Sequence, residues 1–139
     1  MDNTMENAIE KATENTTENV MKKIILVDDA NVFLLSVKER LKRYYEIYPA
    51  KSAEILFEIL EKITPDLILL DIYMPDVDGY EVIKKLKSDD RYTEIPVIFL
   101  TGKNDRRSAI KGMSLGASDF ITKPINDKVF MEKLSKISF

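Results

Sequence analysis

The sequence predicts an α/β fold in which a doubly wound, five-stranded parallel sheet carries helices on both faces. Four apolar runs, at 24–27, 67–70, 97–100 and 120–122, each end at a polar residue. Apolar runs of this length between turn residues are typical of strands that are buried on both faces. Segments with helical periodicity lie between the runs, and this alternation indicates βαβ units, which build parallel sheets.

The first part of the folded region contains three expected strands and two expected helices. In chain order these are a strand at 23–27, a helix near 31–44, a strand at 46–50, a helix near 53–63 and a strand ending at Leu70. The apolar stripes of the two helices, which we expect to face inward, are Phe33, Val37 and Leu41, then Ala53, Leu56, Leu60 and Ile63. Thr64-Pro65 stops the second helix, because proline cannot continue one.

The second part contains three expected helices and two expected strands. In chain order these are a helix through Val82, Ile83 and Leu86 after a turn at Gly79, a strand introduced by Pro96, a helix containing Ile110 and Met113, a strand through 120–122, and a helix through Phe130, Leu134 and Ile137. Gly116 is expected to end the helix before the last strand.

Composition excludes several classes of function. The 139 residues suit one domain, and a net charge of −3 offers no basic footprint for nucleic acid. The chain has no cysteine and no histidine, which excludes disulfides, thiol chemistry and imidazole catalysis. No apolar stretch approaches the roughly 20 residues of a membrane span, and the N-terminus lacks the apolar core of a secretion signal. We therefore expect a cytoplasmic protein.

Residues 1–20 differ in composition from the folded region at 21–139. They are rich in Asn, Thr and Glu, and their five acids recur every four residues with only Lys11 as a counter-charge. A helix here would carry a destabilising stripe of like charges. The composition favours a mobile acidic tail over an ordered helix.

The polar residues at the strand ends carry the main functional signal. Asp28-Asp29, Asp71, Thr101 and Lys123 each follow one apolar run. In an open parallel sheet the ligand site lies beyond the carboxyl ends of the strands, so three carboxylates, a hydroxyl and an ammonium should gather at one edge. Each has a plainer explanation when taken alone: an Asp pair can cap a helix, Thr favours strands, and Lys123-Pro124 can form a simple turn.

Taken together, these groups fit phosphoryl transfer. Three adjacent carboxylates repel one another, and Mg²⁺, which prefers oxygen ligands, would relieve that repulsion. Lys123 supplies a mobile positive charge for a phosphate oxygen, and Thr101 supplies a hydroxyl donor. Because the chain lacks His and Cys, the nucleophile is best assigned to a carboxylate, which would form an aspartyl phosphate.

Six motifs resemble the receiver domain of two-component response regulators over about residues 22–139. They are Val27-Asp28-Asp29, Leu69-Leu70-Asp71-Ile72-Tyr73-Met74-Pro75, Asp78-Gly79-Tyr80, Pro96-Val97-Ile98-Phe99-Leu100-Thr101, Gly116-Ala117-Ser118-Asp119-Phe120 and Thr122-Lys123-Pro124. The resemblance implies a flavodoxin-like (CheY-like) sheet of strand order 2-1-3-4-5. It also implies a signalling switch rather than an enzyme, in which Asp71 takes a phosphoryl group from a sensor histidine kinase or a histidine phosphotransfer protein.

The resemblance also assigns roles to individual residues. Asp29 and Asp71 would bind Mg²⁺ directly, Asp28 through water, and Tyr73 through its backbone carbonyl. Lys123 would pair with the phosphoryl group. Thr101 matches the hydroxyl of the family's switch pair and Phe120 its aromatic ring. Tyr73 also matches a variable position that controls access of water, and we expect its bulk to slow self-hydrolysis.

Receivers commonly signal through their fourth helix, fifth strand and fifth helix. Here that face would carry six bases, namely Arg106, Arg107, Lys111, Lys128, Lys133 and Lys136. They form either a plain solvated face or a docking surface for a downstream protein or a second copy of the chain. Because the sequence stops soon after the last expected helix, both a stand-alone receiver and the receiver part of a longer regulator remain open.

Two other functions fit the sequence less well. A haloacid-dehalogenase-type aspartyl phosphatase also uses a strand-end Asp and Mg²⁺, but it places a general acid two residues after the nucleophile, where this chain has Tyr73. A receiver-like scaffold that is never phosphorylated would usually lack Asp71, Lys123 or the acidic pair, and all are present.

Overall fold

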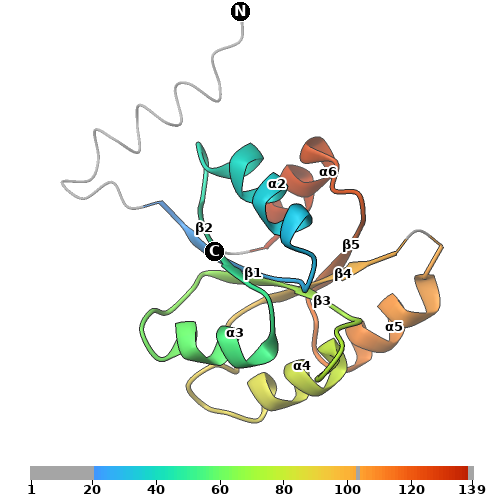
Figure 1. Cartoon of the computed structure of the whole chain (residues 1–139). Helices are drawn as coiled ribbons and strands as arrows, with labels where there is room; N and C mark the ends of the chain where they lie inside the picture. Colours follow the sequence, from blue (N-terminus) through green and yellow to red (C-terminus); the bar gives the residue numbers. More distant parts are fainter. Residues whose placement is uncertain (1–20, 103, 138–139) are drawn as a thin grey trace, which may run out of the picture.

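Five parallel strands form one sheet of order β2-β1-β3-β4-β5, as the sequence predicted (Figure 1). The computed structural model describes residues 21–102 and 104–137, so the expected tail at 1–20 lies outside the described residues. The strands are β1 (Lys23–Val27), β2 (Glu46–Ala50), β3 (Leu67–Asp71), β4 (Val97–Thr101) and β5 (Asp119–Thr122). The helices are α2 (Asn31–Leu41), α3 (Ala53–Leu60), α4 (Gly79–Lys87), α5 (Arg106–Ser114) and α6 (Asp127–Ser135).

The helices cover both faces of the sheet. Figure 1 shows α2 and α6 above the sheet and α3, α4 and α5 below it. Successive strand residues point to opposite faces. Accordingly, Ile24 and Leu26 of β1 belong to the buried cluster beneath α2 and α6, whereas Ile25 and Val27 belong to the one beneath α3 and α4. Among the described residues, no helix is long and apolar enough to cross a membrane.

Three helices end earlier than predicted. α2 ends at Leu41 and α3 at Leu60, each three residues before its predicted end, and α6 ends at Ser135, before Ile137. Ile63 and Ile137 both follow a helix end and are half-buried against the core. Apolar periodicity thus overestimated helix length, because residues in the turn after a helix can still pack inward.

The inward face of α2 differs by one residue from the prediction. Leu34, Val37 and Leu41 are buried, whereas Phe33 is only half-buried at the edge of the core. Phe33 is therefore free to contact groups at the carboxyl ends of the strands, and its contact is described below.

Small residues form the inward face of α5, for which no prediction was made from the sequence. Ile110 and Met113 are 57% and 40% exposed, and Ala109 and Gly112 face the sheet instead. The reason is steric: a Cβ atom at Gly112 would lie 2.4 Å from the Phe99 ring. The aromatic ring on β4 fills the interface, so the helix must present its smallest residues there. Two apolar side chains remain on the outer surface of α5.

Gly79, the first residue of α4, lies against the backbone of the loop that follows β3. Its N–H donates to the carbonyl of Ile72, and a Cβ atom here would lie 2.6 Å from the Asp71 carbonyl oxygen and 2.8 Å from Ile72 Cα. Both neighbours are backbone atoms, which cannot move aside as a flexible side chain could. The start of α4 therefore fits only glycine.

We expect Gly79→Ala to lower the free energy of unfolding by about 1–3 kcal/mol, the usual penalty for overpacking. Urea unfolding followed by circular dichroism would measure the change. Gly102→Ala is the matched control, because a Cβ atom at Gly102 meets no atom of the other described residues within 4 Å. If the two variants are equally stable, the backbone contact at Gly79 does not constrain the fold.

Candidate phosphoryl-acceptor site

The parallel sheet brings the three predicted aspartates together. Asp71 ends β3, Asp28 and Asp29 follow β1, and these two strands are neighbours in register, with Val27 opposite Leu70. One oxygen of each carboxylate lies within 4.8 Å of the other two. Asp28 is fully buried and Asp71 is 7% exposed, whereas Asp29 faces solvent. The cluster is thus buried on the side of Asp28 and Asp71 and open to solvent on the side of Asp29.

Lys123 reaches this cluster from the turn after β5. Its Nζ lies 2.5 Å from Asp28 Oδ2 and 3.5 Å from Asp71 Oδ2. The ammonium also lies 4.7 Å from the centroid of the Phe33 ring, an arrangement that favours the cation. Lys123 therefore bridges two of the three carboxylates. Phe33 was not predicted as part of the site, because an aromatic residue in a helical stripe looks like an ordinary core residue.

The cluster changes the acidity of Asp71. Burial raises the pKa of the Asp71 carboxyl to about 6, and the nearby charge of Asp28 adds to the rise. The ammonium of Lys123 and the Tyr73 N–H, which donates to Asp71 Oδ1 at 3.3 Å, lower the pKa without cancelling these effects. One lysine thus compensates only part of the negative charge.

The donor atoms suit a hard divalent cation. Asp28 Oδ1 accepts a hydrogen bond from the Ala30 N–H at 2.9 Å, which fixes that carboxylate. Asp28 Oδ2 is buried and accepts no hydrogen bond from the described residues, although Lys123 forms an ion pair with it. Carboxylate oxygens that converge with uncompensated charge are the ligands that Mg²⁺ prefers. The described residues therefore fit a magnesium ion.

Tyr73 lies just beyond β3 and connects this loop to α5. Its side chain is 58% exposed, and its hydroxyl lies 2.5 Å from Ser108 Oγ. The hydroxyl of Tyr80 donates to the backbone carbonyl of the same Ser108 at 2.8 Å. Ser108 was not predicted, and no motif in the sequence marks it. Its place follows only from how closely α5 packs beside α4.

Thr101 and Phe120 lie on the two strands beside the cluster. Thr101 ends β4 with 2% exposure, and its carbonyl accepts from the Lys123 N–H at 2.8 Å. Phe120 on β5 is half-buried, and Lys133 Nζ lies 4.6 Å from its ring centroid. Thr101 is thus at the carboxyl edge of the sheet, whereas Phe120 lies two residues before the end of the neighbouring strand, opposite Phe99.

The chain belongs to the response regulator receiver domain family, whose sequence model matches residues 24–135. It is 42% identical over 103 residues to a probable cyclic di-GMP phosphodiesterase of Vibrio cholerae, a match that covers 74% of this chain and 23% of that protein. It is 39% identical over 118 residues to the response regulator PleD of Caulobacter vibrioides, covering 84% and 26%. The chain thus spans about a quarter of the length of these relatives.

Solved structures agree with the family. The chemotaxis protein CheY4 of Vibrio cholerae superimposes with a TM-score of 0.78 at 25% identity, covering 86% of this chain and all of that one. The N-terminal signal receiver domain of a Bacteroides fragilis response regulator gives 0.75 at 29% identity, covering 84% and 95%. Family membership and the CheY-like fold, both expected from the motifs, are confirmed.

We expect Asp71→Asn to stabilise the fold in metal-free buffer. Because the pKa of Asp71 is raised in the folded protein, the folded state holds its proton more tightly than the unfolded chain does. The free energy of unfolding therefore falls as pH rises through about 6. The variant removes this charge, so its free energy of unfolding should exceed that of the native chain by about 1–2 kcal/mol at neutral pH. The difference should shrink as pH falls through about 6.

Urea unfolding with EDTA, at neutral pH and near about pH 5, would measure this gain. Asp90→Asn is the control, because Asp90 is an exposed aspartate in the turn after α4, at the other edge of the sheet. If Asp71→Asn is less stable than the native chain at neutral pH, the ionised Asp71 carboxylate does not destabilise the fold.

Proposed function

We propose that this receiver domain is a switch controlled by phosphorylation of Asp71, which requires Mg²⁺. The observation that carries the proposal is the Asp71 carboxylate itself, nearly buried among Asp28, Asp29 and Lys123 at the carboxyl edge of the sheet. The donor would be the phosphohistidine of a sensor histidine kinase or of a histidine phosphotransfer protein. A cytoplasmic location, expected from composition, is part of this proposal.

Asp71 would act as the nucleophile. An oxygen of its carboxylate attacks the phosphorus of the donor, so a P–O bond forms while the P–N bond to the donor's imidazole breaks, and the released imidazole takes up a proton. The reaction needs Asp71 to be ionised, and its pKa of about 6 leaves it mostly a carboxylate at neutral pH. Self-hydrolysis would later release inorganic phosphate.

The metal would be held by the aspartates and by one backbone group. Asp29 and Asp71 would bind Mg²⁺ directly, Asp28 through water, and Tyr73 through its backbone carbonyl. When bound, the ion supplies positive charge that offsets the carboxylates and the incoming phosphoryl oxygens. Lys123 already lies 3.5 Å from Asp71 Oδ2 and would pair with a phosphoryl oxygen by a small movement away from Asp28.

Thr101 and Phe120 would pass the signal outward. The Thr101 hydroxyl would turn toward the phosphoryl group, and the Phe120 ring, now half-buried, would turn inward behind it. The family's output face corresponds here to α5, β5 and α6, which carry the bases predicted from the sequence. Exposed Ile110 and Met113 on α5 add apolar surface, and this supports a docking role toward a downstream protein or a second copy.

Incubation with Mg²⁺ and acetyl phosphate tests the proposal, with intact mass as the readout. The native chain should gain one phosphoryl group, and EDTA or Asp71→Asn should abolish the gain. Asp76→Asn is the matched control, because Asp76 is an exposed aspartate in the loop after β3, and it should be phosphorylated normally. No gain, or a gain that survives Asp71→Asn, would favour a scaffold that is not phosphorylated at Asp71.

We expect Tyr73→Ala to shorten the lifetime of the phosphorylated state several-fold. The Tyr73 ring is held toward α5 by the contact with Ser108, beside the acceptor, where it would hinder approach of water. Decay of the phosphorylated mass after removal of acetyl phosphate measures this lifetime. Tyr73→Phe keeps the ring and should stay close to the native rate. An unchanged lifetime in Tyr73→Ala would show that the Tyr73 ring does not hinder the approach of water.

A further inference from the structure

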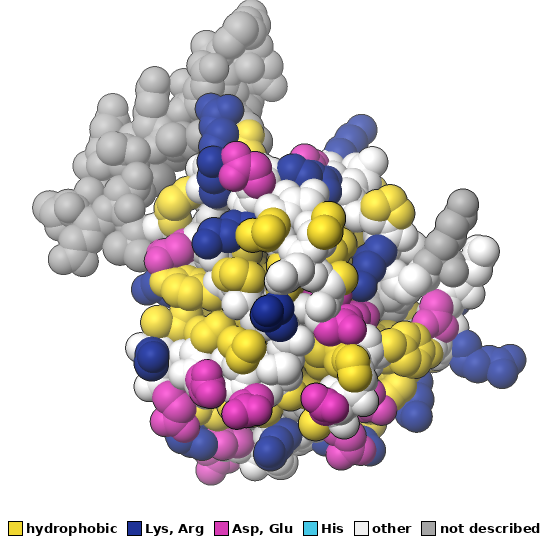
Figure 2. Space-filling model, in the orientation of Figure 1, with side chains coloured by type: hydrophobic (Ala, Val, Ile, Leu, Met, Phe, Trp, Pro, Cys, Tyr) yellow, Lys and Arg dark blue, Asp and Glu magenta, His cyan; other side chains and the backbone are white. Residues whose placement is uncertain are grey.

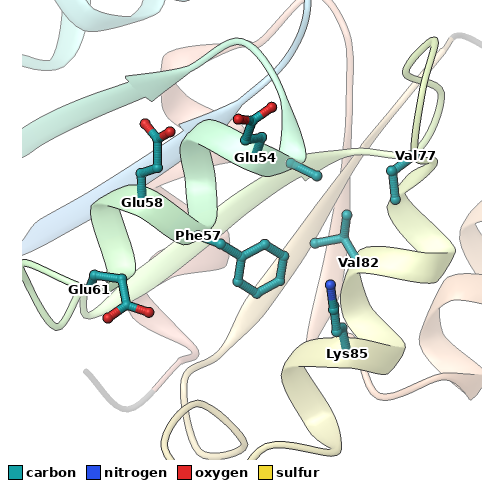
Figure 3. A pocket seen from close by; sticks show the side chains of 8 residues that line it. Glu54, Phe57, Glu58, Glu61, Val77, Val82 and Lys85 are labelled. Atoms are coloured by element: carbon teal, nitrogen blue, oxygen red, sulfur yellow. The ribbon is translucent and has the colours of Figure 1, made fainter.

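A groove of about 570 Å³ runs between α3 and α4 (Figure 3). Its lining comes from both helices and from the loop after β3, and consists of Ala53, Glu54, Phe57, Glu58, Glu61, Val77, Val82 and Lys85. The receiver mechanism described above uses none of these side chains. The groove also lies on different helices from the output face at α5, β5 and α6.

The middle of the groove is apolar. Figure 3 shows the Phe57 ring projecting from α3 toward Val82 of α4, with Val77 beside it. Val82 is 1% exposed and forms the floor, whereas Val77 is 42% exposed at the side. Exposed apolar surface of this kind between two helices can receive the apolar face of another helix.

An acidic stripe on α3 borders this apolar surface. Glu54, Glu58 and Glu61 are all exposed, and their spacing of four and three residues places them on one side of the helix. Among the described residues, no lysine or arginine lies within ion-pair distance of any of the three. Like charges at this spacing destabilise a helix. Within the described part of the chain the stripe forms no ion pair, although Arg91 attracts Glu61 at longer range.

Among the described residues that line the groove, Lys85 is the only base, and it does not neutralise the stripe. Its Nζ lies over the Phe57 ring, 5.1 Å from the centroid, and Figure 3 shows it reaching from α4 toward the ring. Three glutamates and one lysine leave the lining with a net charge of 1 − 3 = −2. An occupant must therefore combine apolar side chains with positive charge.

We infer that this groove docks a basic amphipathic helix of a protein partner. Apolar side chains of the partner would enter between Phe57 and Val77, and lysines or arginines spaced three to four residues apart would face Glu54 and Glu58. From Glu54 to Glu61 the stripe spans about 10 Å, which matches two turns of a partner helix. The inference does not depend on phosphorylation of Asp71.

A second copy of the chain is a less suitable occupant. Its α5 does carry exposed Arg106, Arg107 and Ile110. However, α5 entering the groove of another copy would join two different surfaces, and such heterologous contacts give rings or open chains rather than a closed pair. The inner side of α5 is also already packed against β4 through Gly112 and Phe99.

Two synthetic 14-residue peptides with helical periodicity test the inference, one of leucine and lysine and one with glutamate in place of every lysine. Each is titrated into the full chain and followed by ¹⁵N–¹H NMR. The basic peptide should bind, with the largest shift changes in α3, α4 and the loop after β3, and the acidic peptide should not. The double variant Glu54→Lys/Glu58→Lys should weaken binding about tenfold.

Glu39→Lys/Glu132→Lys is the matched control. It makes the same change in net charge at exposed glutamates of α2 and α6, on the opposite face of the sheet, and should bind nearly as the native chain does. Equal weakening by both double variants, binding of the acidic peptide, shift changes centred elsewhere, or no binding of the basic peptide would each overturn the inference. Shift changes in the groove on concentrating the protein alone would identify a second copy as the occupant instead, and would overturn it too.

Discussion

The structure depends on two neighbouring carboxylates that are held almost entirely out of contact with water. Asp28 and Asp71 lie side by side with almost no exposure, and a single ammonium, that of Lys123, contacts both. Desolvation and mutual repulsion raise the pKa of Asp71, so the resting site carries strain that added positive charge would relieve. A site of this kind responds strongly to a cation or to a change of charge on Asp71, as the proposed switch requires.

The parallel sheet makes this arrangement unavoidable. Because β1 and β3 are neighbours with the same direction, their carboxyl ends must deliver Asp28 and Asp71 to the same place. The tight start of α4, where Gly79 touches the backbone beside Asp71, fixes the loop that carries Tyr73. Tyr73 and Tyr80 then both contact Ser108, so the loop beside the acceptor is connected to α5 by hydrogen bonds. A change at Asp71 therefore has a short physical route to the surface.

Two surfaces of opposite character lie on the same side of the sheet. α5 is basic and exposes Ile110 and Met113, whereas α3 carries an acidic stripe that forms no ion pair with a described residue and that borders an apolar groove. Figure 2 shows acidic side chains most densely in the lower part of the view, with basic and apolar side chains interspersed among them. Only α4 separates the two surfaces (Figure 1). The fold could thus bind partners of opposite charge without overlap between them.

The sequence by itself determined the sheet, its strand order through the family motifs, and the cluster of Asp28, Asp29, Asp71 and Lys123. These follow from local signals, since apolar runs mark buried strands and the direction of parallel strands decides where their ends meet. Tertiary packing alone decided that Phe33 lies beside Lys123 and that α5 exposes Ile110 to solvent. It also decided that the hydroxyls of Tyr73 and Tyr80 both form hydrogen bonds with Ser108. Such contacts depend on the volume left between elements distant in the chain, here the space that the Phe99 ring occupies, and no periodicity within one helix encodes that volume.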